Sequence, residues 1–199
     1  MKPKKTKRIV FVCTGNTCRS PIAEYLCRKQ IERLQLKNVK VCSVGIKAVS
    51  GTPINEKSAL LLAEQGIDTT EFTSTKLTNR LLKDAFALVC MTESQRDLLM
   101  EMRWKALRAA GEDEIENNVY SFAELVGYQI IDPYGKDLDC YRYVFELISG
   151  GMTTLLDKLL PPEIRETRQR KPRKVKTDGE TEAPSAPKKR GRPRKNKEN

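Results

Sequence analysis

Hydrophobic residues in the first 160 positions fall into short continuous runs separated by longer amphipathic stretches. Three of the runs are too short for surface helices, so each predicts a strand. These runs are Ile9–Val12, Val39–Val44 and Ala85–Met91. A fourth run, Val119–Phe122, predicts another strand or the edge of one.

Between these runs, apolar residues recur every three or four positions, the spacing of a helix with one buried face. We expect helices over about 21–36, between 55 and 66, over 77–83, from 94 onward and over 138–159. Ser94 should cap the fourth of these helices, whose inward-facing residues should be Leu98, Leu99, Met102 and Trp104. In the last helix Gly150-Gly151 favours a looser or kinked turn, and Pro161-Pro162 ends it.

Strand and helix thus alternate about four times along the chain. This order predicts a three-layer α/β/α domain over residues 7–160, with a parallel sheet of about four strands covered by helices on both faces. In such sheets ligands bind beyond the carboxyl ends of the strands. The loop after the first strand is therefore the first place to look for a site.

That loop is Cys13–Ser20, and it connects the first strand directly to the first helix. A helix start presents unpaired N–H groups and a partial positive charge, so it attracts phosphate. Ser20 suits the N-cap position and Pro21 the first helical position, while Gly15 and Asn16 tolerate a tight turn. The sequence therefore predicts a phosphate cradle next to a cysteine.

The residues of this loop fit phosphoryl transfer through a thiol. Cys13 is the candidate nucleophile, and the helix start together with the Ser20 hydroxyl favours its thiolate form. Backbone N–H groups of residues 14–19 and the Arg19 guanidinium match the oxygens of a phosphate. Because the chain contains no histidine, the acid for the leaving group must be another residue, and Asp132 before Pro133 is the best candidate.

In these motifs the chain resembles the low-molecular-weight protein-tyrosine-phosphatase family over nearly all of residues 7–160. The resemblance rests on Val12–Pro21 with Ala23-Glu24, Ser43–Gly45, Gly51–Pro53, Leu88–Thr92 and Asp132–Gly135. It implies a phosphoenzyme at Cys13, a phosphate clamp at Arg19, and Asp132 as acid and then as base toward water. It implies no metal and no cofactor. The substrate-binding residues would be Thr14, Gly15, Asn16, Thr17, Cys18, Ser20 and Tyr134, the last as a wall of the pocket.

Within this family, Thr17 separates two substrate classes. Tyrosine phosphatases usually carry an aliphatic residue there, whereas the protein-arginine-phosphatase branch is similar to this chain in its Thr-Gly-Asn-Thr sequence. Thr17 would narrow the pocket and hydrogen-bond a phosphoguanidinium, whose charge Asp132 could pair. We therefore favour phosphoarginine on proteins, with phosphotyrosine as the alternative. A thioredoxin-coupled arsenate reductase is a third relative, but it needs further resolving cysteines, and Cys90 falls in a predicted strand.

The six cysteines show neither dense disulfide spacing nor a paired zinc pattern, which favours a reduced, cytoplasmic protein. Cys18 has two interpretations: it packs in the loop, or, because it is close to Cys13 in the sequence, it forms a reversible disulfide that shields the nucleophile. The other four cysteines are expected to be core residues without a catalytic or redox role; they are Cys27, Cys42, Cys90 and Cys140. No apolar run approaches the length of a membrane span, so no membrane association is expected.

The net charge of +11 comes from the ends of the chain, because residues 9–160 hold 18 basic and 20 acidic side chains. Residues 1–6 form a basic extension, and residues 161–199 form a tail too poor in hydrophobic residues to pack. Within the tail, 188–195 resembles an AT-hook, in which Arg190 and Arg192 would enter the minor groove of A·T-rich DNA. The alternative is an unspecific basic tail. Oligomeric state is not predicted.

Overall fold

The computed structural model describes residues 6–112 and 116–165. The expected N-terminal extension lies outside these ranges except for Thr6, and the expected tail lies outside them from residue 166 onward. The AT-hook-like segment 188–195 is among the residues not described, so its role stays a prediction.

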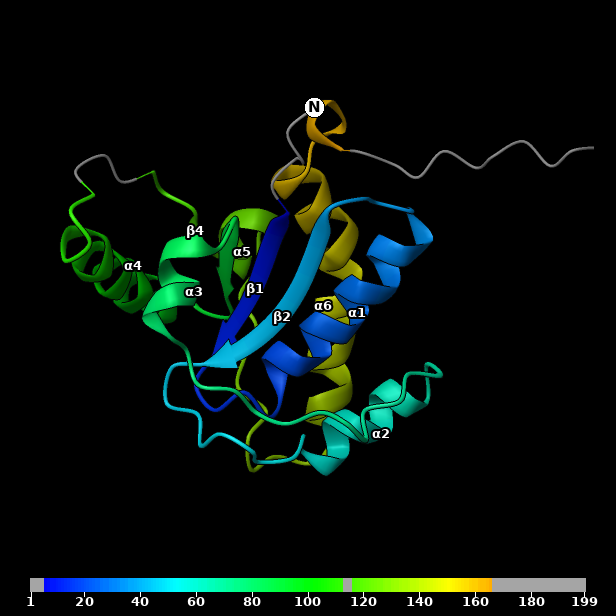
Figure 1. Ribbon diagram of the computed structural model, residues 1–199. Helices are drawn as coiled ribbons and strands as arrows, with labels where there is room; N and C mark the ends of the chain where they lie inside the picture. The colour runs from blue at the N-terminus through cyan, green and yellow to red at the C-terminus, as the bar shows by residue number, and fades with distance from the viewer. Residues whose placement is uncertain (1–5, 113–115, 166–199) are drawn as a thin grey trace, which may run out of the picture. The chain divides into compact units, whose positions relative to one another are not determined.

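The predicted strands form one four-stranded parallel sheet in the order β2-β1-β3-β4 (Figure 1). The strands are β1 Lys7–Cys13, β2 Val39–Gly45, β3 Ala87–Cys90 and β4 Val119–Ser121. The central strand β1 pairs with β2 along its full length, so that Cys13 stands opposite Gly45 at the end of the ladder. The carboxyl ends of all strands lie at the same end of a parallel sheet, and Cys13 lies at this end.

Six helices and one 3₁₀ turn accompany the sheet in the described part of the chain. They are α1 Arg19–Arg33, α2 Glu56–Ala63, α3 Asn79–Asp84, α4 Glu93–Arg108, α5 Phe122–Val126, α6 Leu138–Leu159 and η1 Pro162–Ile164. Side-chain oxygens cap the starts of five helices, which satisfies N–H groups that have no partner within the helix. These caps are Asn55, Thr78, Thr92, Ser121 and Asp137.

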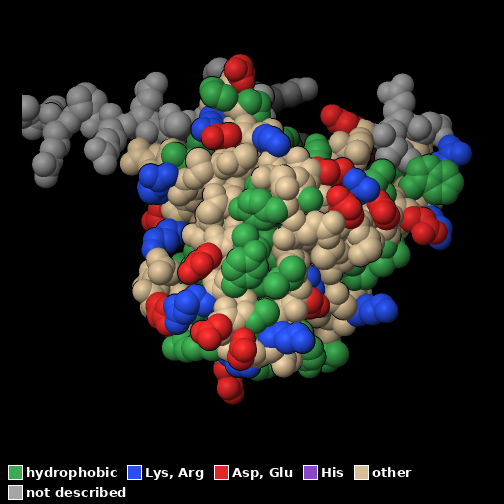
Figure 2. All heavy atoms as spheres, turned by 180° about the vertical axis from the view of Figure 1, so that it is seen from behind, with side chains coloured by type: hydrophobic (Ala, Val, Ile, Leu, Met, Phe, Trp, Pro, Cys, Tyr) green, Lys and Arg blue, Asp and Glu red, His purple; other side chains and the backbone are tan. Residues whose placement is uncertain are grey.

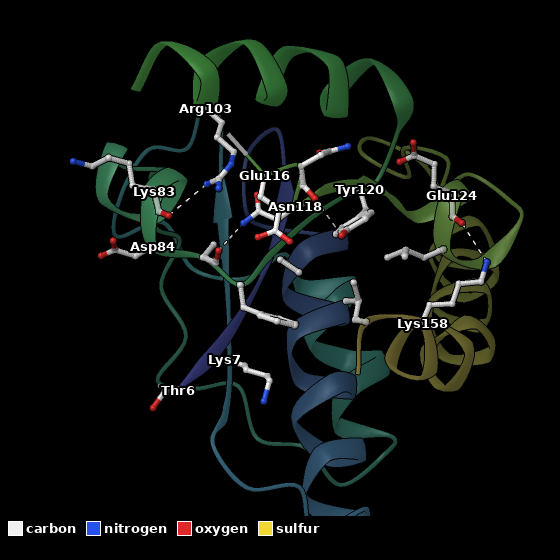
Figure 3. A pocket seen from close by; sticks show the side chains of 16 residues that line it. Thr6, Lys7, Lys83, Asp84, Arg103, Glu116, Asn118, Tyr120, Glu124 and Lys158 are labelled. Atoms are coloured by element: carbon white, nitrogen blue, oxygen red, sulfur yellow. Dashed lines mark hydrogen bonds between the residues drawn. The ribbon is translucent and has the colours of Figure 1, made fainter. Parts of the chain in front are cut away.

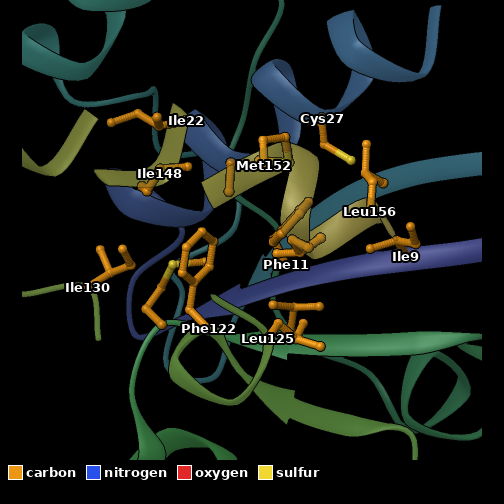
Figure 4. Packing of buried hydrophobic residues seen from close by; sticks show 14 of the residues in the cluster. Ile9, Phe11, Ile22, Cys27, Phe122, Leu125, Ile130, Ile148, Met152 and Leu156 are labelled. Carbon is orange, nitrogen blue, oxygen red and sulfur yellow. The ribbon is translucent and has the colours of Figure 1, made fainter. Parts of the chain in front are cut away.

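Alternate side chains of β1 enter two separate cores, as the two-residue period of a strand requires. Ile9 and Phe11 pack with residues of α1, α5 and α6, and Figure 4 shows this larger core. Val10 and Val12 pack on the opposite face with residues of α3 and α4. Both faces of the sheet are covered, which confirms the three-layer α/β/α prediction.

The structure corrects the predicted details of α4. Its cap is Thr92, whose hydroxyl accepts from the Gln95 N–H, rather than Ser94. Leu98 and Trp104 are 42% and 51% exposed, contrary to the expectation that they face inward. The buried stripe is narrower and consists of Leu99, Arg103 and Leu107. The physical reason is that only one side of α4 contacts the sheet and α3, so a single row at spacing four suffices.

Two other elements differ from the prediction. Ser121 ends β4 and starts α5, since its side chain and that of Glu124 form a reciprocal capping box that the hydrophobic pattern did not reveal. The helix α6 runs without interruption through Gly150-Gly151. Gly151 is needed for packing instead, because a Cβ there would lie 2.9 Å from a ring carbon of Phe122.

Figure 2 shows the molecule from behind. Hydrophobic side chains form a strip down the middle of this face, and acidic and basic side chains lie intermixed around it. This mixture agrees with the near balance of charge over residues 9–160. Within 6–112 and 116–165, no helix has both the length and the apolar character that crossing a membrane requires.

Candidate active site

The loop 14–18 connects β1 to α1 at the carboxyl edge of the sheet. Cys18 occupies the position before α1 and makes no side-chain cap. Ser20 is therefore not the helix cap that the sequence predicted, and Pro21 is the third helical residue rather than the first. The reason is that the Ser20 hydroxyl is buried and faces the sulfur of Cys13 at 3.0 Å.

Asn16 supports the loop from beneath. Its φ of 57° lies in the left-handed region that Asn tolerates, and its backbone N–H donates to the sulfur of Cys13 at 3.2 Å. Its Nδ2 donates to the hydroxyls of Ser20 and Ser43 at 3.0 and 2.8 Å, while its Oδ1 accepts from the N–H of Thr75 at 2.7 Å. Because the Ser20 oxygen accepts from Asn16, its own hydrogen is available as a donor to the Cys13 sulfur.

This network continues to a buried carboxyl group in α1. The Ser43 hydroxyl donates to Oε2 of Glu24 at 2.6 Å, and Arg28 forms an ion pair with Oε1. Burial raises the pKa of Glu24, while the bonds to Ser43 and Arg28 partly oppose that rise. Polar contacts therefore run without a gap from Glu24 through Ser43 and Asn16 to Ser20, and they fix the loop against α1 and β2.

The end of β2 approaches the loop too closely for any side chain at Gly45. A Cβ on Gly45 would lie 2.7 Å from the carbonyl oxygen of Thr14 and 2.9 Å from the backbone nitrogen of Asn16. The next turn is joined to the loop, since the N–H of Lys47 donates to the Thr14 carbonyl at 2.9 Å. Gly45 is thus required by packing against the backbone.

Arg19 and Asp132 meet across the site although they are far apart in the sequence. Nη2 of Arg19 lies 2.7 Å from Oδ2 of Asp132, and Nη1 donates to the carbonyl oxygen of Ile130 at 3.3 Å. The Arg19 side chain is 5% exposed, whereas that of Asp132 is 54% exposed. The other oxygen of Asp132 accepts from the N–H of Tyr134 at 3.2 Å, which orients the carboxylate.

A cavity of about 460 Å³ opens over the loop. Eight of the ten predicted site residues line it: Cys13, Thr14, Gly15, Thr17, Cys18, Arg19, Asp132 and Tyr134. Asn16 and Ser20 do not line it, because they are fully buried beneath the loop. The remaining wall comes from the segment after β2 and contains Lys47, Val49, Thr52, Pro53 and Asn55.

Two polar side chains that the sequence did not single out also contact the loop. Nε2 of Gln95 in α4 donates to the hydroxyl of Thr14 at 3.1 Å. The hydroxyl of Tyr141, buried in α6, lies 3.3 Å from the sulfur of Cys18. Both reach the loop only through the packing of distant helices, so no local sequence pattern marks them.

The six cysteines are free thiols, and Cys13 and Cys18 are both buried. Cys27 and Cys90 lie in the core as expected, and burial raises the pKa of Cys90 to about 12. Cys42 and Cys140 are only partly buried, and Cys42 packs against the core formed by Val10 and Val12 with α3 and α4. A regulatory bond between Cys13 and Cys18 stays a prediction.

Comparison with known proteins adds independent information. A family model described as "Low molecular weight phosphotyrosine protein phosphatase" matches residues 8–169. A Ralstonia nicotianae protein named "Probable low molecular weight protein-tyrosine-phosphatase EpsP" is 31% identical over 77% of this chain and 96% of its own length. A protein-arginine-phosphatase from Geobacillus stearothermophilus is 30% identical over 76% of this chain and 93% of its own. The structure of the YwlE arginine phosphatase from that organism superposes with a TM-score of 0.65, at 29% identity, over 77% of this chain and 92% of its own.

Proposed function

Because this chain belongs to the low molecular weight phosphotyrosine protein phosphatase family, we propose that it hydrolyses phosphoarginine on proteins through a phosphocysteine at Cys13. The observation that carries the proposal is the convergence of Cys13, Arg19 and Asp132 on one cavity. A nucleophile, a phosphate clamp and a proton donor are the groups that thiol-dependent phosphoryl transfer needs.

In the first step the Cys13 thiolate attacks phosphorus in line with the bond to the leaving nitrogen. An S–P bond forms from the thiolate electron pair, and the P–N bond breaks as Asp132 donates a proton to the guanidine nitrogen. The loop N–H groups and Arg19 hold the three equatorial oxygens. In the structure the Arg19 guanidinium donates hydrogen bonds to Asp132 and to the carbonyl oxygen of Ile130. In this step the phosphate oxygens must replace them as acceptors.

In the second step water attacks the phosphocysteine. The Asp132 carboxylate accepts a proton from this water, the S–P bond breaks, and inorganic phosphate leaves. The sulfur of Cys13 departs as a thiolate, which the Ser20 hydroxyl at 3.0 Å stabilises. The network beneath the loop therefore serves both steps by keeping Ser20 oriented.

The preference for phosphoarginine rests on Thr17. Thr17 lines the cavity, and its carbonyl oxygen accepts from the N–H of Asn55 at 2.9 Å, which fixes the position of the residue. A hydroxyl there can accept a hydrogen bond from an N–H of a phosphoguanidinium. The tyrosine and arginine phosphatase relatives have nearly equal identity, so this local chemistry decides the proposal.

The test compares kcat/KM on two peptides of the same sequence, one with phosphoarginine and one with phosphotyrosine. We expect the wild-type protein to favour phosphoarginine and Thr17→Ile to shift the ratio toward phosphotyrosine by about tenfold or more, the usual effect of a small change in a pocket. Thr154→Ile, an exposed threonine in α6, is the matched control. Equal or better turnover of phosphotyrosine, unchanged in Thr17→Ile, overturns the preference.

Phosphotyrosine hydrolysis in the same cavity is the second candidate function, and the same assay identifies it. Arsenate reduction has less support, since Cys90 is fully buried in β3 and its raised pKa makes it a poor thiol for exchange. DNA tethering through Arg190 and Arg192 rests on composition alone. Salt-sensitive DNA binding that disappears when 161–199 is deleted, with phosphatase activity intact, is its test.

A further inference from the structure

A second, larger cavity lies at the opposite end of the sheet from the phosphate loop. Its volume is about 880 Å³, and Figure 3 shows the side chains around it. Lys7, Ala87 and Tyr120 place it at the beginnings of β1, β3 and β4. Since β1 has seven residues, the cavity is about 20 Å from Cys13. We call it the rear cavity.

Arg103 forms part of the wall and is only 8% exposed. Its Nη1 donates to the carbonyl oxygens of Leu82 and Lys83, which end α3, so this half of the guanidinium has a structural role. Its Nε is buried and has no hydrogen-bond partner among the described residues. Within the ranges 6–112 and 116–165 no carboxylate forms an ion pair with it, which leaves its Nε–Nη2 edge without an acceptor.

Asn118 contributes a complementary group to the same wall. Its Nδ2 donates to the carbonyl oxygen of Ala85 at 2.7 Å, but its Oδ1 is buried and has no partner in the part of the chain that the structure describes. Unmade hydrogen bonds inside a protein are costly and rare, and each calls for an explanation. Among the described residues, the wall of the rear cavity thus has two buried polar atoms without partners, Nε of Arg103 and Oδ1 of Asn118.

The charges around the rear cavity favour an anion. Lys83 and Lys158 line it together with Arg103. Of the wall carboxylates, Asp84 pairs with Arg80 and Glu124 with Arg96, so their charges are already compensated. Glu116 is the remaining carboxylate of this wall; it supports the charged form of Arg103, although burial lowers the pKa of Arg103 on balance.

We propose that the rear cavity binds a small molecule through a carboxylate or phosphate group, held side-on by the Nε–Nη2 edge of Arg103. This edge of a guanidinium matches two oxygens of such a group. A hydrogen-bond donor on the molecule binds Oδ1 of Asn118. The apolar part of the molecule lies against Phe86 and Leu159, which also line the cavity. The site shares no residue with the phosphate loop, so it stands independently of the proposed reaction.

Residue-resolved NMR titration of the full chain in low-salt buffer tests this site, with citrate as the carboxylate probe and inorganic phosphate as the phosphate probe. The signals to follow are the side-chain Nε–H of Arg103 and the backbone amides of Phe86 and Asn118. We expect saturable shifts there with at least one probe. Shifts of the amides of residues 14–17 report binding at the phosphate loop separately, so the two sites are distinguished in one experiment.

The variant Arg103→Lys keeps a charge but loses the forked edge, and it should weaken binding about tenfold or more. Lys83→Glu leaves the contacts of Arg103 in place and should weaken binding several-fold, which keeps the test valid if Arg103→Lys unfolds. Lys105→Gln, an exposed residue of α4 paired with Glu101, is the control. The proposal is overturned if neither probe gives saturable shifts at these positions, or if both wall variants bind as the wild-type protein does.

Discussion

Nη2 of Arg19 lies 2.7 Å from Oδ2 of Asp132, so one charged hydrogen bond joins the loop after β1 to the loop before α6. Within the proposed mechanism, this contact holds the phosphate clamp next to the proton donor before substrate arrives. A bound phosphate would compete for the same donor of Arg19 and release the Asp132 carboxyl group toward the leaving nitrogen. Because Asp132 is half-exposed, this ion pair contributes little to the free energy of folding. Its role in the proposed mechanism is to position the two side chains.

Removing the carboxyl group of Asp132 should therefore affect catalysis more than folding. We expect Asp132→Ala to lower kcat by about 10²–10⁴-fold on substrates with poor leaving groups, the usual contribution of general acid catalysis. Substrates with good leaving groups should be affected less in the first step. Asp139→Ala, an exposed carboxylate of α6, is the control and should act as the wild-type protein. Full activity of Asp132→Ala on a poor leaving group would exclude the assigned role.

The network around Asn16 makes a prediction for stability. Asn16→Ala removes hydrogen bonds to Ser20, Ser43 and Thr75 and places alanine at a φ of 57°. We expect a loss of about 2–4 kcal/mol in the free energy of unfolding, from unpaired buried groups and backbone strain, together with a large fall in kcat.

Asn38→Ala separates these two contributions. Asn38 has nearly the same φ, 56°, at an exposed position, so its substitution imposes a similar backbone cost away from the site. Chemical denaturation of both variants measures the difference. Equal losses for the two variants would mean that the side-chain network of Asn16 contributes nothing.

Two glycines should respond in opposite directions to alanine. Gly45→Ala forces a Cβ to within 2.7 Å of the Thr14 carbonyl oxygen, so the loop must move, and we expect a destabilisation of about 1–3 kcal/mol with loss of activity. Gly150→Ala has open space, with the nearest atom at 4.0 Å, and should stabilise α6 by about 0.5–1 kcal/mol. Thermal melts of both variants are the measurement. A fully active, stable Gly45→Ala protein would contradict the close approach.

Glu24 should make stability depend on pH. Its pKa is raised above the usual value of 4.5 by burial, so in the interval above 4.5 the folded protein binds more protons than the unfolded chain. The free energy of unfolding should therefore fall as pH rises through this interval, relative to Glu24→Gln. Glu64→Gln is the control of opposite sign, because Arg142 lowers the pKa of Glu64. Urea denaturation at a series of pH values measures both; parallel curves for the wild-type protein and Glu24→Gln would contradict the assignment.

The sequence was sufficient for the strands, the layer order and most of the cavity wall, because these depend on local periodicity and on a loop contiguous in the chain. The predictions from sequence were wrong where the same local pattern fits two arrangements of a side chain. Ser20 suits a helix cap, but in the fold its hydroxyl faces the Cys13 sulfur. Likewise Leu98 and Trp104 follow helical spacing, yet α4 buries only one row of side chains.

The contacts that complete the loop could not be predicted for a different reason. Gln95 and Tyr141 reach Thr14 and Cys18 from helices far along the chain, and their positions depend on how those helices pack. The rear cavity is similar, because Arg103 and Asn118 meet only when α3, α4 and β4 come together.

The central claim, that Cys13 accepts a phosphoryl group from phosphoarginine, is tested most directly by trapping the intermediate. The wild-type protein should be mixed with a phosphoarginine peptide, quenched in acid after a fraction of a turnover, digested and analysed by mass spectrometry. We predict that the peptide containing Cys13 gains the mass of one phosphoryl group, and that the same peptide from a Cys13→Ala control gains none at that turnover. Phosphate release without any adduct on Cys13, or undiminished hydrolysis by Cys13→Ser alone, would contradict the mechanism.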